Sequence, residues 1–155
     1  GLDFLTQSRD DGASIAHAAA ANGDANVLEW IQDTTGLGLQ FLRQVADDGR
    51  TIAHWAAANG EHVVLEWIRN CPGLGLDFLT QSRDDGASIA HAAAANGDAN
   101  VLEWIQDTTG LGLQFLRQVA DDGRTIAHWA AANGEHVVLE WIRNCPGLGL
   151  DFLTQ

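Results

Sequence analysis

The chain contains no lysine, methionine or tyrosine, and only two prolines and two cysteines among its 155 residues. All eight basic residues are arginines, and 21 acidic residues leave a net charge of −13. This deficit of positive charge argues against nucleic acid and against an anionic membrane surface as partners, because both attract basic proteins. No apolar run approaches the roughly 18 residues that cross a bilayer. Since no targeting pattern is present either, we expect a soluble protein of unassigned compartment, compatible with the cytoplasm.

The two cysteines are too far apart in the expected architecture to form a disulfide. Cys71 and Cys145 hold the same position in two copies of a repeat, with other repeated units between them. A disulfide needs Cα atoms within about 7 Å. The sequence therefore predicts two free thiols.

Repetition is the strongest feature of the sequence. Residues 75–148 repeat residues 1–74 without one difference, and each 74-residue copy contains two halves of 37 residues that agree at 23 positions. A fixed period of about 20–50 residues is typical of solenoids, propellers and arrays. We therefore expect a single repeat domain over 1–155, with units at 1–37, 38–74, 75–111 and 112–148 and a stub at 149–155.

Each unit is predicted to form two helices joined by a tight turn. In the second unit, Thr51 is the expected N-cap of a helix over 52–58, and Gly60 is the expected left-handed residue that ends it. A second helix is expected from Glu61 onward. Its apolar side recurs at helical spacing, through Val64, Leu65, Trp67 and Ile68.

A third element and the tryptophans complete the expected unit. The segment Leu39–Val45 is compatible with one short helical turn, and whether it and its equivalents form a third helix is left open. Tryptophans in the second helix are predicted to lie in the core, at Trp30, Trp67, Trp104 and Trp141. For Trp55 and Trp129, which align with alanines in the other unit type, we expect packing against Ala18 and Ala92; exposed anchors on a binding face are the alternative.

The segment DDGRTIAHWAAANGEHVVLEWI resembles an ankyrin repeat. The matching positions in the second unit are Gly49, Thr51, His54, Ala56-Ala57, Gly60, Val64-Leu65 and Trp67-Ile68. About 22 of each 37 residues take part, in all four units, although each unit is longer than the usual 33 residues. The resemblance implies an all-α, ankyrin-like helical solenoid of four stacked helix-turn-helix units.

One histidine per unit carries the next expectation, because the matching ankyrin histidine bonds the turn backbone between units. The resemblance implies this structural role for His17, His54, His91 and His128. Helix capping is predicted for the hydroxyl residues three positions earlier, Ser14, Thr51, Ser88 and Thr125. These histidines lie on successive layers and do not converge, so no metal site is predicted.

Other patterns that carry chemistry are incomplete. The Asp-Asp-Gly turns lack the rest of a calcium-binding repeat, and the Gly-Leu-Gly connections lack the third glycine of a dinucleotide loop. Ser14 and His17 form a Ser/His pair with no third group to orient the base. We expect no catalytic residue, no cofactor and no metal ligand, and therefore not an enzyme.

Two functions from different classes follow. The undrifted duplication and the start at Gly1 indicate an engineered scaffold made by doubling a two-unit segment. Solenoid ends normally carry polar caps, and their absence here predicts end-to-end association with further copies. The alternative is an ankyrin-type module that binds an unidentified protein. Its expected contact residues are at the turns, namely Arg9, Asp10, Asp47, Arg50, Arg83, Asp84, Asp121 and Arg124.

Overall fold

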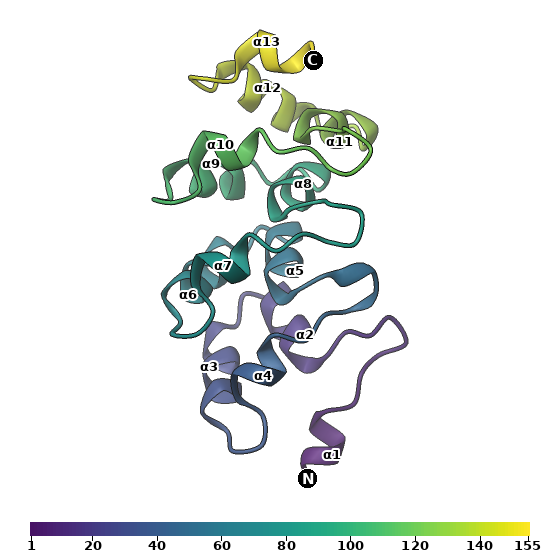
Figure 1. The fold of residues 1–155 in the computed structure, drawn as a ribbon, viewed down its shortest axis with the longest axis vertical. Helices are drawn as coiled ribbons and strands as arrows, with labels where there is room; N and C mark the ends of the chain where they lie inside the picture. The colour runs from purple at the N-terminus through teal and green to yellow at the C-terminus, as the bar shows by residue number, and fades with distance from the viewer.

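The computed structural model describes all residues from 1 to 155, and its secondary structure is helical without a β-strand. Thirteen α-helices recur in a fixed order along the chain. Figure 1 shows them stacked as an elongated column, with the N-terminus at its foot and the C-terminus at its top. Because the first helices of successive layers pack on one another, and each second helix packs on the short helix that follows it, the chain is a helical repeat solenoid.

Each layer contains three helices of different lengths. The first helices of the layers are α2 (Ile15–Ala21), α5 (Ile52–Ala58), α8 (Ile89–Ala95) and α11 (Ile126–Ala132). The second helices are α3 (Ala25–Asp33), α6 (His62–Asn70), α9 (Ala99–Asp107) and α12 (His136–Asn144). Four short helices precede them, one in each repeat: α1 (Leu2–Leu5), α4 (Gly38–Leu42), α7 (Gly75–Leu79) and α10 (Gly112–Leu116). A fifth short helix, α13 (Gly149–Leu153), lies in the stub after the last repeat.

Local sequence signals set the ends of the two main helices. The Thr51 side chain caps α5 by accepting from the backbone N–H groups of Ala53 and His54. After α5, Gly60 has φ of +74°, the left-handed conformation that glycine adopts without strain. These features agree with the prediction for the first helix, and α6 begins one residue after Glu61.

The third element is a helix, shorter than the segment considered from the sequence. In the second repeat α4 ends at Leu42, and Arg43 already lies outside it. The Gly73-Leu74-Gly75 connection that leads to the next short helix needs both glycines, with φ of +93° and +68°. At Gly73 a Cβ atom would also collide with a methyl group of Leu39. Gly73 and Gly75, whose Gly-Leu-Gly pattern was compared with a dinucleotide loop, therefore serve to turn the chain sharply between two helices.

The core runs continuously through the column. The first helices pack through alanines, and α6 buries Val64, Leu65 and Ile68 completely. The prediction that the tryptophans of the second helices occupy the core is wrong: Trp30 is 51% exposed, and the other three lie partly buried at its margin. The apolar side of each second helix is wider than the surface that the core covers. The tryptophans lie at the edge of that side, where they are only partly buried.

The turns between repeats are joined to one another by backbone bonds. Within one turn the Ala46 N–H donates to the Arg50 carbonyl at 2.8 Å. Between turns the Asp47 N–H donates to the Asp11 carbonyl, also at 2.8 Å. The same bond recurs from Asp84 to Asp48 and from Asp121 to Asp85. The turns therefore form a connected row along one edge of the column, although none is a β-hairpin.

Candidate functional site

The repeated histidines lie at the junctions between layers. His17 Nδ1 accepts from the backbone N–H of Ser14 at 3.2 Å, which completes a capping box. Its Nε2 lies 3.1 Å from the carbonyl oxygen of Arg50 in the next layer. Because a backbone N–H can only donate and a carbonyl can only accept, the proton of the neutral ring is on Nε2. The ring thus joins one helix start to the turn of the following repeat.

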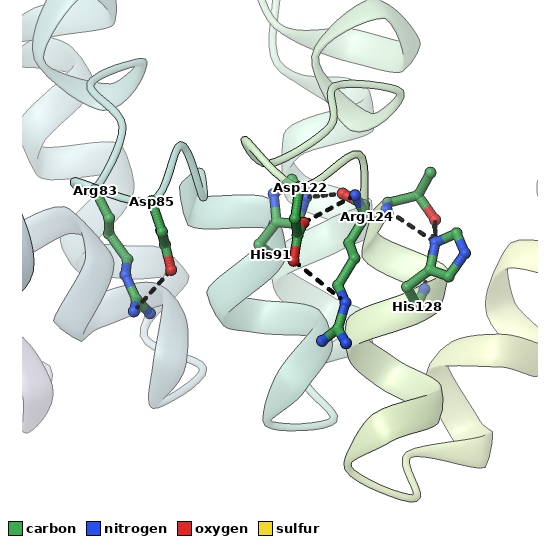
Figure 2. A network of polar contacts seen from close by, with 7 residues as sticks. Arg83, Asp85, His91, Asp122, Arg124 and His128 are labelled. Carbon is green, nitrogen blue, oxygen red and sulfur yellow. Dashed lines mark hydrogen bonds and ion pairs between the residues drawn. The ribbon is translucent and has the colours of Figure 1, made fainter.

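The same bonds recur at the next two junctions. His54 Nε2 lies 3.3 Å from the Ala87 carbonyl oxygen, and His91 Nε2 lies 3.1 Å from that of Arg124. Figure 2 shows His91 beside Arg124 of the next layer. His128 has a polar contact only within its own layer, to Thr125. His128 keeps its bond from the Thr125 N–H at 3.0 Å but has no following turn to reach, and its side chain is exposed.

Burial keeps the inner histidines neutral. It lowers the pKa of His54 to about 4, against a smaller opposing effect of the bond to Ala87. Burial likewise lowers the pKa of His17 and of His91. Ser14 Oγ is 3.0 Å from His17 Nδ1, but this hydroxyl is buried and accepts from the Ala16 N–H as a helix cap. A substrate has no access to that hydroxyl.

The turn residues predicted as a protein-binding face lie along the exposed edge of the column. Asp10, Asp47, Asp84 and Asp121 are exposed. The four arginines are each paired with an aspartate of their own turn, at 3.4 Å for Arg9–Asp11, 3.7 Å for Arg50–Asp48, 3.2 Å for Arg83–Asp85 and 3.3 Å for Arg124–Asp122. Three of these pairs are exposed and contribute little to stability, so their charges stay available to a partner at small cost; the Arg83 side chain is only 17% exposed.

A groove lies beside this edge, between the tryptophans of α5 and α11. Trp55 and Trp129 line it together with Arg50 and Arg83, and Ala92 lies between the two indoles. The cavity has a volume of about 320 Å³. Both indole N–H groups and the Nε–H groups of both arginines lack a hydrogen-bond partner. The groove therefore combines two aromatic walls with unused donors. The sequence offered Trp55 and Trp129 as alternative binding anchors, but it did not predict that they share one groove, because its residues come from three layers.

The tryptophans are only half-buried, and their packing differs from the prediction. The Trp55 ring meets the edge of His17, with ring centres 5.4 Å apart, and the Arg9 guanidinium lies 5.5 Å from the Trp55 ring centre. Ala18, the expected partner, is exposed. Ala92 is buried as expected, between Trp55 and Trp129. Each indole therefore packs on the preceding layer with one side and faces solvent with the other.

Acidic side chains form a second repeated feature, at the starts of the second helices. Asp98 precedes α9 and lies between Glu61 of the layer before and Glu135 of the layer after. Burial, followed by the charges of Glu135 and Glu61, raises the pKa of Asp98 to about 6. One carboxylate oxygen of Asp98 has no hydrogen-bond partner. This carboxylate is therefore disfavoured in its charged form.

Replacing Asp98 by asparagine is expected to stabilise the fold by about 1 kcal/mol at pH 7, after allowance for solvent screening of a partly exposed group. The raised pKa makes the folded state bind a proton that the unfolded state releases near pH 3.8. The stability that this proton gives is complete below about pH 4 and is lost as the pH rises through 6, so the gain from Asp98→Asn should vanish in acid. Denaturant unfolding at several pH values measures this difference in the free energy of unfolding.

The same change at Asp24 is the matched control, because Asp24 is exposed and has no preceding layer. An equal gain in stability from Asp24→Asn would contradict the explanation.

The two ends of the column expose surfaces that are buried inside it. At the first layer Phe4 is 75% exposed and Val27 40% exposed, although the same residues in the third repeat, Phe78 and Val101, are 2% and 0% exposed. At the last layer an open groove is lined by Ala127, His128, Ala131, Leu139 and Leu153. The equivalents of these residues at the junction of the second and third repeats, 74 positions earlier, are all buried. Identical sequence therefore gives opposite burial, according to whether a neighbouring layer is present.

Other chemistry finds no support in the arrangement of side chains. No group of three or more histidine, cysteine, aspartate or glutamate side chains lies in a geometry that could hold a metal ion. Cys71 and Cys145 are free and buried, as predicted from their spacing, and burial raises the pKa of both thiols. No helix has the length and apolar character needed to span a membrane.

Comparisons with protein-family models and with curated proteins found no match to this chain. The class that the structure defines is a helical repeat solenoid, and any function has to be inferred from the end faces, the turns and the groove.

Proposed function

We propose that this chain is a non-catalytic scaffold of ankyrin-like repeats, engineered by doubling a two-unit segment, that associates end to end with further copies of itself. One observation carries the proposal. The last repeat has the sequence of the second, and the first repeat has the sequence of the third. A second copy placed on the last layer would therefore meet the surface that the second repeat already meets inside the chain.

The polar groups at the two ends are complementary in the same way. His128 has an unused Nε2 donor, and the Ala13 carbonyl at the other end is the equivalent of Ala87, which accepts from His54. A head-to-tail contact of this kind is heterologous, so each added copy leaves the same two ends exposed and the assembly grows as an open column. Screening by salt is expected to favour growth, because every copy carries a net charge of −13.

The ankyrin assignment rests on repeat-level features. Each unit has a capped first helix, a glycine between helices and an apolar second helix, and in the first three units a histidine bonds the next turn. The turns bonded in a row take the place of the hairpins of the usual 33-residue unit. The extra length of this 37-residue unit lies in the short third helix.

Val27→Glu is expected to abolish self-association while leaving the fold intact. The side chain is 40% exposed at the first layer, but its equivalent Val101 is completely buried against the preceding layer. A carboxylate placed there would be buried without a partner when two copies meet, which costs several kcal/mol. Sedimentation velocity over a range of concentrations measures the effect.

Val63→Glu is the matched control. Val63 is 57% exposed in an inner layer, so it lies outside the junctions, and its change should leave association as it is in the parent chain. If both glutamate variants associate as the parent does, the end faces are not the contact.

A second candidate function is protein binding through the groove between Trp55 and Trp129. The unused indole and guanidinium donors favour it, because buried donors gain most from a ligand that supplies acceptors. Aromatic and arginine side chains are also those that dominate protein interfaces. Trp55→Ala distinguishes the two functions. It removes one wall of the groove but lies in an inner layer, away from both end faces, so it should weaken partner binding and leave end-to-end association unchanged.

A further inference from the structure

The first and last helices of the chain have the same sequence but different surroundings. Residues 1–7 and 149–155 both read GLDFLTQ. In α13, Phe152 is 3% exposed because it packs on α12, as α7 packs on α6 inside the column. In α1, Phe4 is 75% exposed, and no residue of this helix is buried. Figure 1 shows α1 at the foot of the column, where no preceding layer covers it.

Both helices belong to the same place in a junction. At the junction of the second and third repeats, α7 lies on the second helix of the preceding layer and leads into the third repeat. Its Leu76 also contacts its own repeat at Gly110, as Leu2 of α1 contacts Gly36. A second copy docked on the last layer in the same manner would therefore bring its α1 to the position that α13 already fills.

We infer that α13 of one copy and α1 of the next compete for a single place at the end-to-end contact, so that Gly149–Gln155 restrains self-association. This inference rests on the proposed function, because it concerns the same contact. Only one of the two identical heptapeptides can pack in the junction. The other is released from its layer.

The competition removes part of the driving force for association. In the free chain α13 already buries the phenylalanine that an inner junction buries. When two copies meet, one buried phenylalanine is present before and after the event, whether α1 replaces α13 or α13 stays. The gain therefore comes only from the remaining surfaces, such as Val27 and Leu139. If α13 is loosened, burial of Phe4 becomes a net gain.

A cycle of substitutions in the full chain tests the competition. Phe152→Ala weakens α13 and leaves Phe4 free to replace it, so association should strengthen by about tenfold to a hundredfold, the value of burying one phenylalanine. Phe4→Ala alone should change the dissociation constant by no more than about twofold, because α13 still fills the place. The double variant should return to the affinity of the parent chain, since neither α1 nor α13 then has a phenylalanine to bury in the junction.

Sedimentation velocity gives the four dissociation constants, and far-ultraviolet circular dichroism checks that each variant is folded. Stronger association of Phe152→Ala than of the parent chain, reversed by adding Phe4→Ala, is the expected result. If the parent associates but Phe152→Ala is no stronger, or if the double variant stays as strong as Phe152→Ala, the competition is wrong and the end-to-end contact stands. If none of the four chains associates, the proposed function itself fails.

Discussion

Replacing His54 by alanine is expected to destabilise the fold by about 3 kcal/mol, whereas the same replacement at His128 should cost less than about 1 kcal/mol. The two histidines lie in 37-residue units of identical sequence. His54 is 2% exposed, and its removal leaves the Thr51 N–H without its acceptor and breaks the bond to the Ala87 carbonyl, which keeps only the Arg83 N–H. His128 loses only the bond within its own cap. Denaturant unfolding monitored by circular dichroism measures both.

The pair separates the contribution of the junction from that of helix capping. Both substitutions destroy the same capping box, so any difference between them belongs to the contact with the next layer. Equal costs would mean that the bond between layers adds nothing measurable.

The pH dependence of the parent chain follows from the same geometry. The unfolded chain binds a proton on His54 near pH 6.5, but the folded chain does so only near pH 4. The stability contributed by the neutral buried ring is therefore present above pH 6.5 and is lost as the pH falls through 4, by about 3 kcal/mol for this residue. His17 and His91 act in the same direction and oppose the effect of Asp98. The cost of His54→Ala should accordingly shrink toward pH 4.

The second large effect is expected at the phenylalanines of the short helices. Phe78→Ala should destabilise the fold by about 3–5 kcal/mol, because it removes a fully buried ring and leaves a cavity in the middle of the column. Phe4→Ala should change the stability by no more than about 0.5 kcal/mol, since that ring is 75% exposed. The 70 residues that follow Phe4 are identical to the 70 that follow Phe78, so the difference comes from the neighbouring layers and not from the local sequence.

Urea or guanidinium unfolding of these two variants tests the dependence of burial on neighbours. A solenoid can lose cooperativity when an inner contact is removed, so Phe78→Ala should also broaden the transition, and Phe4→Ala should leave its width unchanged. A large cost at Phe4 would show that α1 is packed in solution and would remove the basis for an exposed first layer.

The helices could be predicted closely because their signals are local. Thr51 and Gly60 mark the limits of α5, and the predicted range 52–58 matches the helix observed. The extent of the third helix was harder to predict, because Gly38–Leu42 is too short to have a period and is held by the layer it packs on. The partial burial of Trp67 at the edge of the core likewise depends on how much of the apolar side of α6 the neighbouring layers cover.

The residues of the candidate sites could be predicted better than the way in which different repeats bring them together. Thr51 was predicted as a helix cap from its own unit, and the bond of His54 to the next turn was implied by the ankyrin resemblance, but the capping box that joins the two residues was not predicted. The groove was not predicted either, because Trp55 and Trp129 come from units separated by another unit, and their distance depends on the curvature of the stack. The raised pKa of Asp98 has the same origin, since its acidic neighbours belong to the layers on either side.

Sedimentation velocity of the unmodified chain, in reductant and at physiological salt, tests most directly the proposal that the exposed end layers make the chain self-associate. The reductant excludes bridges through Cys71 and Cys145. We predict an average mass that rises with concentration above the 16.6 kDa of one chain, without a limiting oligomer, as an open head-to-tail column requires. A single species of 16.6 kDa at every concentration would contradict it.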